Sequence, residues 1–238
     1  IDLKKIKGDL QMHTTFSDGK HSIQDMAQKA KELGYEYIAI TDHSKSVRIA
    51  KGMDSKQIKR QCKEIDKIGE SMGVRILKGA EVDILADGSL DYEDDILMEL
   101  DIVLVSIHMK QSMNKKEMTE RILKALDNKY VNILAHPTGR LIKKREGYDA
   151  DFEKIFKKCA KKGVAVEINC DPERLDLSDH MILSAKKHGV KFSFGTDAHA
   201  KDSLDNVRFG LGQARRGWLE TKDVINTKTY KQLKRFLK

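Results

Sequence analysis

Short apolar runs alternate with amphipathic helical segments along the whole chain, and this alternation restricts the possible folds more than any other feature. Seven runs are typical of strands and lie at residues 10–12, 35–40, 74–77, 101–107, 131–135, 164–168 and 191–194. Helical periodicity marks residues 22–33, 54–72, 115–128, 151–162, 178–188 and 226–237. Strands that alternate with helices form parallel sheets with right-handed crossovers, either in an open doubly wound sheet or in a closed barrel.

Length and composition favour one soluble domain. The chain has 238 residues, which is inside the range of a single barrel domain, and only two prolines, with no low-complexity block to mark a linker. No apolar stretch reaches the roughly 18 residues that a membrane helix needs, and the N-terminus lacks the core of a signal peptide. We therefore expect a cytoplasmic protein with no membrane partner. The three cysteines are widely spaced and predicted to be reduced.

The net charge of +8 favours anionic partners such as phosphate esters or nucleic acid. A lysine-rich solvated surface explains the same charge, and composition alone does not separate the two interpretations.

Polar side chains of metal-binding types follow the apolar runs. In a parallel barrel the carboxyl ends of the strands meet at one face, where active sites are built. Five of the eight histidines are predicted to lie there, and the remaining three, His21, His180 and His188, are assigned no function. The polar residues at or after strand ends are Gln11, His13, Asp42, His43, Glu81, Asp83, His108, His136, Glu167, Asn169, Asp197 and His199.

Imidazoles clustered with carboxylates suit divalent transition metals, chiefly Zn, Mn or Fe. The predicted face offers more ligands than one ion uses. We therefore expect two to three divalent metal ions.

The ordered motifs resemble those of the PHP family, the polymerase and histidinol phosphatase metallohydrolases. They are the run from Asp9 to Gly19, then Ile40-Thr41-Asp42-His43-Ser44, Glu81, His108, His136-Pro137 and Gly195-Thr196-Asp197-Ala198-His199. The resemblance covers nearly the whole chain. It implies a distorted (β/α)7 TIM-like barrel, an α/β single domain, with a trinuclear metal site.

Within that family the chain is similar to the C-terminal PHP domain of bacterial and archaeal family X DNA polymerases. The segments that carry this similarity are residues 41–46, 136–140 and 169–177. The resemblance implies that residues 1–238 form one PHP domain. Because the chain begins with Ile, we expect a polymerase module upstream in a longer chain.

The resemblance also implies the ligand sets and the catalytic residues. One ion is expected on His13, Glu81 and Asp197, a second on Glu81, His108 and His136, and a third on Asp18, His43 and His199. Glu81, His43 and Asp197 are the expected catalytic residues. A carboxylate such as Glu81 can bridge two ions, and such a pair can activate water and clamp phosphoryl oxygens.

Gln11 departs from the family pattern, which usually has a histidine at this position. An amide oxygen is a poorer ligand than imidazole for zinc-like ions, so the site next to it is expected to be weakened. Three interpretations stay open: natural drift with activity retained, a degenerate site that binds without cutting, or a deliberate substitution.

Basic and polar residues beside the predicted mouth are candidates for binding substrate phosphate. Arginine can bind phosphate oxygens through two parallel hydrogen bonds, and lysine acts as a point charge. A solvated surface role remains an alternative for each of these side chains. The candidates are Lys45, Arg48, Lys110, Arg140, Asn169 and Arg174.

These features favour a metal-dependent phosphoesterase that acts on DNA ends as a 3′-5′ exonuclease or 3′-end-processing enzyme. A small-molecule phosphomonoesterase of the histidinol-phosphatase type would use the same ions. A catalytically silent nucleic-acid-binding PHP module is the third hypothesis, supported by Gln11 and the surface charge.

Overall fold

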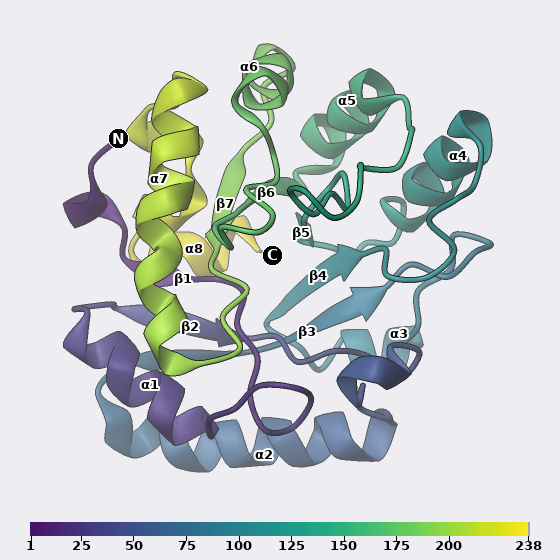
Figure 1. The fold of residues 1–238 in the computed structure, drawn as a ribbon. Helices are drawn as coiled ribbons and strands as arrows, with labels where there is room; N and C mark the ends of the chain where they lie inside the picture. The colour runs from purple at the N-terminus through teal and green to yellow at the C-terminus, as the bar shows by residue number, and fades with distance from the viewer. Residues whose placement is uncertain (238) are drawn as a thin grey trace.

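Seven parallel strands form one nearly closed barrel, in the order β1 to β7 along the sheet (Figure 1). The computed structural model describes residues 1–237. The strands are β1 (Gly8–Asp9), β2 (Tyr37–Ile40), β3 (Arg75–Asp83), β4 (Ile102–Ser106), β5 (Ile133–Leu134), β6 (Ala165–Asn169) and β7 (Phe192–Gly195). Each strand pairs in parallel with the next, so their carboxyl ends meet on one face. The predicted TIM-like (β/α)7 fold is confirmed.

The helices lie on the outside of the strands (Figure 1). Their bounds are α1 (Ile23–Glu32), α2 (Ser55–Met72), α3 (Asp94–Leu97), α4 (Lys115–Ala125), α5 (Phe152–Lys162), α6 (Asp179–Lys187), α7 (Val207–Arg216) and α8 (Tyr230–Phe236). Ser22 and Asp54 form capping boxes at the starts of α1 and α2, as expected for N-cap residues. Gly73 ends α2 in the left-handed conformation at φ 72°.

Backbone and side-chain hydrogen bonds together close the barrel between the edges that carry β1 and β7. The Leu10 N–H donates to Phe194 O at 3.3 Å, and the Asp197 N–H donates to Gln11 O at 3.0 Å. The Asp9 carboxylate accepts hydrogen bonds from the Thr196 hydroxyl (2.5 Å) and the Thr196 N–H (3.1 Å). Beyond the strands, Met12 pairs with Ala198. At the amino-terminal end, the Asn226 amide bonds to Gly8 O at 2.9 Å and to Phe194 O and N at 2.9 and 2.7 Å.

Apolar side chains fill both the barrel interior and the layer between strands and helices. Interior residues such as Leu10, Leu77 and Leu104 pack together with Ile225 and Leu233 from the C-terminal segment, which covers the amino-terminal end. A larger cluster joins the outer faces of the strands to the helices. Polar side chains therefore collect at the remaining carboxyl end. Within residues 1–237, no helix has the length and apolar character needed to span a bilayer.

Several boundaries differ from those expected. The last helix begins at Tyr230, not at 226, because Thr229 caps it and residues 225–227 form a separate 3-10 turn. Strand β3 extends to Asp83, so Glu81 lies inside this strand and not after it. Helices α3 and α7 were not expected. Helix α7 contains Gly210 and Gly212, which weaken helical propensity.

Candidate metal centre

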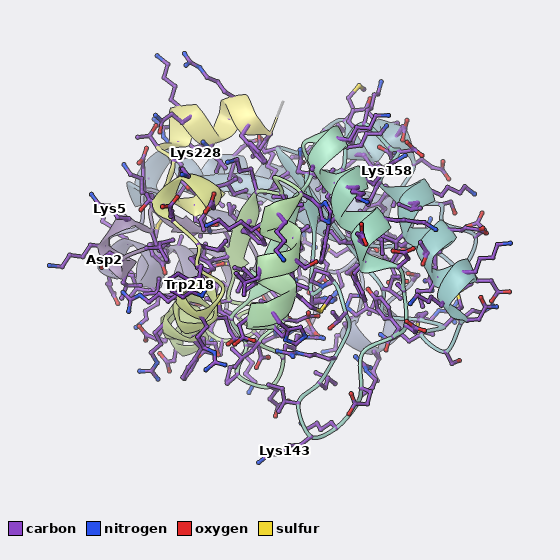
Figure 2. The ribbon with its side chains drawn as sticks, turned by 90° about the horizontal axis from the view of Figure 1, so that it is seen from above. Asp2, Lys5, Lys143, Lys158, Trp218 and Lys228 are labelled. Carbon is purple, nitrogen blue, oxygen red and sulfur yellow. The ribbon has the colours of Figure 1, made fainter. Side chains whose placement is uncertain are left out.

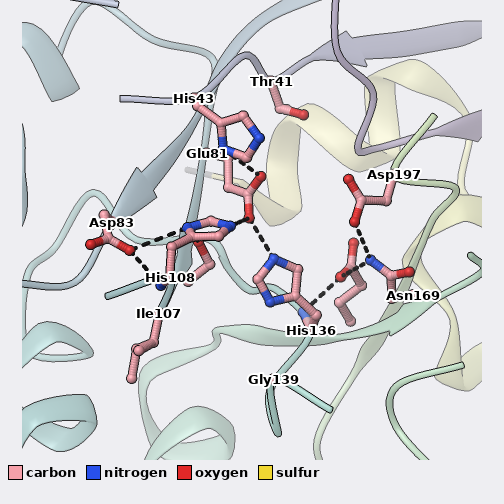
Figure 3. Close-up of polar contacts among 12 residues, drawn as sticks. Thr41, His43, Glu81, Asp83, Ile107, His108, His136, Gly139, Asn169 and Asp197 are labelled. Carbon is pink, nitrogen blue, oxygen red and sulfur yellow. Dashed lines mark hydrogen bonds and ion pairs between the residues drawn. The ribbon is translucent and has the colours of Figure 1, made fainter. Parts of the chain in front are cut away.

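Four histidines surround the carboxylate of Glu81 at the carboxyl end of the barrel. His136 Nε2 lies 2.6 Å from Glu81 Oε1, and His108 Nε2 lies 3.4 Å from the same oxygen. The other oxygen, Oε2, lies 3.3 Å from His43 Nδ1 and 3.5 Å from His13 Nε2. Figure 3 shows His43, His108 and His136 directed at Glu81 from three different strand ends. Glu81 is fully buried at the centre of this group.

Within the described residues, three overlapping sets of side chains place their ligand atoms within 4.8 Å of one another. They are His13, Asp18, His43 and His199; His43, Glu81 and His108; and His13, Glu81 and Asp197. Seven of the eight expected ligands belong to these sets, and the eighth, His136, contacts Glu81 directly, so all eight lie at one site. The division among ions differs in two respects. His43 accompanies Glu81 and His108 where His136 was expected, and His13 joins Asp18, His43 and His199 in the outer set. The assignment of ligands to individual ions stays a prediction.

Unpaired buried atoms show that these residues fit metal ions. Glu81 Oε2, His43 Nδ1 and both side-chain polar atoms of Gln11 are buried and lack a hydrogen-bond partner. His13 and His136 also leave Nδ1 without a partner. Buried polar groups are costly unless they are paired, and coordination by a cation satisfies carboxylate oxygens and imidazole nitrogens. The donor set of imidazoles and carboxylates is one that Zn, Mn and Fe accept.

The two buried carboxylates at the centre are strongly acidic. Burial opposes ionisation of Glu81, but the facing imidazoles of His43, His108 and His136 hold its pKa well below the usual range. Burial likewise opposes ionisation of Asp197. Its 3.0 Å hydrogen bond to His13 and the nearby positive charge of Arg174 nevertheless hold its pKa well below the usual value. Both carboxylates are therefore anionic, which is the form that binds cations.

The outer part of the site carries an ion pair. Burial would lower the pKa of His199, but the carboxylates of Asp18 and Asp197 raise it to about 9. Burial would raise the pKa of Asp18, but its hydrogen bond to His199 and the nearby His43 lower it to about 2. Burial and the neighbouring His13 lower the pKa of His43 to about 3. His43 is therefore deprotonated near neutral pH, whereas His199 must release a proton when it binds a metal ion.

Carboxylates behind the histidines fix their orientation. Asp83 Oδ1 accepts hydrogen bonds from His108 N–H (2.8 Å) and Nδ1 (3.2 Å), which leaves His108 Nε2 facing Glu81. Glu167 accepts from the His136 N–H at 2.7 Å. The sequence placed Asp83 and Glu167 at strand ends but did not indicate these supporting roles, because the pairing depends on side-chain direction.

Asp42 organises the loop that carries Asp18. This buried carboxylate accepts hydrogen bonds from Thr14 N–H and Oγ1 at 2.7 and 2.6 Å. It also accepts from Ser17 Oγ and from Gln61 Nε2 of α2, each at 2.5 Å. Helix α2 and the strand ends therefore hold the loop in one position, which places Asp18 beside His43 and His199.

Gly195 makes room for the side chains of Gln11 and Glu167. A Cβ at position 195 would lie 2.1 Å from Glu167 Oε1 and 2.6 Å from Gln11 Cβ, so any other residue would displace both side chains. Gln11 is fully buried with its amide unpaired. The structure thus leaves the Gln11 amide available at the place where the family pattern has a histidine.

The six candidate phosphate-binding residues fall into two groups. Arg174 reaches the centre, with Nε 3.3 Å from Asp197 Oδ2, and Asn169 Nδ2 donates to the same oxygen at 3.1 Å. Arg140 instead donates through Nε to Arg174 O at 2.9 Å and through Nη2 to Leu175 O. Asn169 is buried and Arg140 is half-buried.

The remaining three candidates, Lys45, Arg48 and Lys110, are exposed on loops that follow β2 and β4. His21 and His180 lie outside the ligand sets: His21 Nδ1 accepts from Lys201 N–H at 3.3 Å, and the side chain of His180 is 80% exposed. His188 is also absent from those sets.

A parallel barrel with overlapping histidine and carboxylate sets at its carboxyl end defines a metal-dependent hydrolase of the TIM-like type. The PHP domain model matches residues 9–195, and the chain belongs to the PHP family of metal-dependent phosphoesterases.

Among curated relatives, DNA polymerase/3′-5′ exonuclease PolX of Bacillus subtilis is 46% identical over the whole chain. The chain spans 42% of the length of that relative. A "Probable phosphatase" of Thermoanaerobacter sp. strain X514 is 30% identical, with 98% of this chain and 95% of the relative covered.

The fold is also that of histidinol phosphate phosphatase from Lactococcus lactis, which was solved with zinc, L-histidinol and phosphate. The two share 17% sequence identity at a TM-score of 0.61, with 88% of this chain and 94% of that chain covered.

Proposed function

We propose that this chain hydrolyses phosphodiester bonds at DNA ends, as a 3′-5′ exonuclease or 3′-end-processing domain. The observation that carries the proposal is the position of Arg174, whose guanidinium lies beside Asp197 at the edge of the ligand sets around Glu81. An anion-binding side chain next to a metal centre is the arrangement that phosphoryl transfer needs. The 46% identity to a relative named as a polymerase and exonuclease supports DNA as the substrate.

The proposed centre holds its ions through the overlapping ligand sets. Glu81 lies in two of the sets, and His136 contacts its carboxylate directly. Divalent ions at such a centre supply Lewis-acid polarisation of phosphoryl oxygens and lower the pKa of bound water. His43 and Asp197 complete the proposed catalytic residues.

Arg174 acts on the substrate itself. Its side chain is 16% exposed, so it is held against Asp197 but still open to the mouth. A guanidinium can donate two parallel hydrogen bonds to phosphate oxygens and neutralise charge that develops on them. Asn169 keeps Asp197 in place by donating to its second oxygen.

A small-molecule phosphomonoesterase is the second candidate function. It is supported by the end-to-end match to the "Probable phosphatase" of Thermoanaerobacter. Such an enzyme would use the same ligand sets and the same arginine, and would differ in what the mouth of the barrel binds.

Hydrolysis of matched substrates separates these functions. The protein is loaded with Mn²⁺ and given an internally labelled oligodeoxynucleotide or histidinol phosphate, and strand shortening and phosphate release are measured. We expect progressive shortening from the 3′ end, which is lost with a chelator and falls at least about a hundredfold in His136→Ala. Lys5→Ala, which removes an exposed charge from the short 3-10 turn ahead of β1, is the control and should retain activity.

Rapid phosphate release from histidinol phosphate without strand shortening would replace this proposal with the phosphatase function. Oligonucleotide binding without hydrolysis of either substrate, in protein shown to contain metal, would favour the silent binding module.

A further inference from the structure

Three loops at the carboxyl ends of the strands each expose a large apolar side chain. Ile49 follows β2 and is 96% exposed, Met109 follows β4 and is 53% exposed, and Ile142 follows β5 and is 39% exposed. These loops surround the same face as the metal centre, because parallel strands end together. Exposed apolar side chains on loops of this face are available to contact a ligand that reaches the metal centre.

Each of these loops also carries a lysine in the left-handed region of backbone space. The φ values are 55° at Lys51, 51° at Lys110 and 62° at Lys143. Glycine adopts this conformation without strain, whereas residues with a Cβ rarely do and incur a cost. Three lysines thus occupy backbone positions that glycine would adopt at lower cost, and each presents its charge from an exposed position.

Hydrogen bonds to the backbone hold the loops in place. Gly52 N–H donates to Val47 O at 3.1 Å in the first loop. In the second, the buried guanidinium of Arg121 from α4 donates to Met109 O at 3.1 Å and Lys110 O at 3.2 Å. The third loop is a short hairpin in which Leu141 and Arg145 exchange two backbone hydrogen bonds of 2.9 Å. The exposed side chains therefore extend from ordered backbone.

The three lysines are not neutralised by neighbours. None of them takes part in an ion pair within 4 Å among the described side chains. Figure 2 shows Lys143 at the tip of a loop that extends from the body of the molecule, on a different side from Lys5 and Lys228. Three unpaired cations on three loops around one mouth suit a partner with several phosphates.

We propose that these loops form a binding rim for an unpaired nucleic-acid strand, defined by Ile49, Lys51, Met109, Lys110, Ile142 and Lys143. The lysines contact successive phosphates, and the apolar side chains lie against the faces of unstacked bases. A duplex hides those faces, and a small phosphomonoester reaches only one cation, so a single strand uses the whole rim. That the bound strand leads into the metal centre rests on the proposed function. Binding to the rim itself is measured without hydrolysis.

Salt-dependent binding tests the lysines. The probe is a fluorescein-labelled oligothymidylate of about twenty nucleotides, and its anisotropy is titrated with protein at several salt concentrations. The logarithm of affinity falls linearly with the logarithm of salt concentration, and each phosphate contact on a single strand contributes about 0.7 to the steepness of this slope. The triple variant Lys51→Gln/Lys110→Gln/Lys143→Gln should therefore make the slope shallower by about 2. The control Lys5→Gln/Lys228→Gln/Lys231→Gln removes the same charge from other surfaces and should leave the slope nearly unchanged.

Two further variants separate a binding role from a structural one. Lys51→Gly/Lys110→Gly/Lys143→Gly should weaken binding as the glutamine variant does, while its thermal unfolding midpoint stays equal or rises because glycine relieves the left-handed strain. Ile49→Ala should weaken binding by about fivefold with an unchanged salt slope, because only apolar contact is lost.

Equal loss of slope in the rim and control variants, or unchanged affinity in the rim variants, would overturn the proposal. The result is independent of catalysis. If wild-type protein binds through the rim but hydrolyses no phosphate ester with metal present, the proposed function fails and the rim stands. If the protein hydrolyses esters but its rim variants bind the oligonucleotide normally, the rim fails alone.

Discussion

The guanidinium groups of Arg140 and Arg174 have different partners, although both residues follow strand ends in the sequence. Arg174 faces Asp197, whereas Arg140 donates to the backbone carbonyls of Arg174 and Leu175. Asp176 reinforces this contact by accepting from the N–H groups of Thr138 and Gly139 at 2.9 and 3.1 Å. Arg140 therefore holds the loop that presents Arg174 to the centre.

Variants of the two arginines should show this dependence. We expect Arg174→Ala to lower kcat/KM about a hundredfold and Arg140→Ala about tenfold, and Arg140→Lys should not restore activity because lysine cannot donate to two carbonyls in the same geometry. In the Arg174→Ala background, Arg140→Ala should have little further effect. Additive losses in this double-mutant cycle would show that Arg140 contacts substrate independently.

Gln11 offers a second test at single-residue scale. Gln11→His replaces an unpaired buried amide with imidazole, so it should tighten the weakest class of Mn²⁺ or Zn²⁺ binding by about tenfold. Calorimetric titration of metal-free protein measures this change. Identical stoichiometry and affinity in the two proteins would contradict a ligand role at position 11.

The sequence predicted most of the side chains that meet at the metal centre. It did not predict which residues hold those side chains in place. The order of histidines and acids at strand ends pointed to one site because parallel strands end on one face. Glu167, Asp83 and Arg140 could not be assigned to their partners from the sequence. Their partners are backbone groups of other loops, and side-chain direction at those positions is set by tertiary packing.

Apolar periodicity in the sequence predicted most helices and strands. It failed for residues 226–229, where polar contacts determine the local structure. Residues 226–229 continue the helical pattern of the last segment, yet the Asn226 side chain leaves it to join β1 to β7. This contact adds to the few backbone hydrogen bonds that join the β1 and β7 edges, because β1 has only two residues. No periodicity in the sequence indicates such a seam.

Removal of the Asn226 amide should weaken the barrel at this seam. Asn226→Ala breaks three buried hydrogen bonds to backbone groups, and we expect it to reduce the free energy of unfolding by about 3 kcal/mol. Lys228→Ala is the neighbouring control and should change stability by less than about 0.5 kcal/mol. Urea denaturation measures both, and equal stability of Asn226→Ala and wild type would exclude a sealing role.

The whole molecule combines an anionic centre with a cationic surface. Glu81 and Asp197 are buried anions that attract metal ions, whereas the net charge of +8 and the rim lysines favour phosphates. In the proposed function, charges of opposite sign would attract substrate phosphates and metal ions to the same face.

Metal binding should also stabilise the fold as a whole. Ligands that bind the native state alone add RT ln(1 + [L]/Kd), so saturating Mn²⁺ at about a hundred times Kd should add about 2.7 kcal/mol. Differential scanning calorimetry with and without chelator measures this gain. In His136→Ala the gain should be smaller, and an undiminished gain would place the stabilising ion elsewhere.

The central claim is that Glu81 and its surrounding histidines hold metal ions. Diffraction from crystals of Mn²⁺-loaded protein, collected at the manganese absorption edge, locates such ions directly. We predict at least two anomalous peaks among the ligand sets, one of them next to Glu81. Well-ordered crystals with bound manganese only at other positions, and none beside Glu81, His108 or His199, would contradict the account.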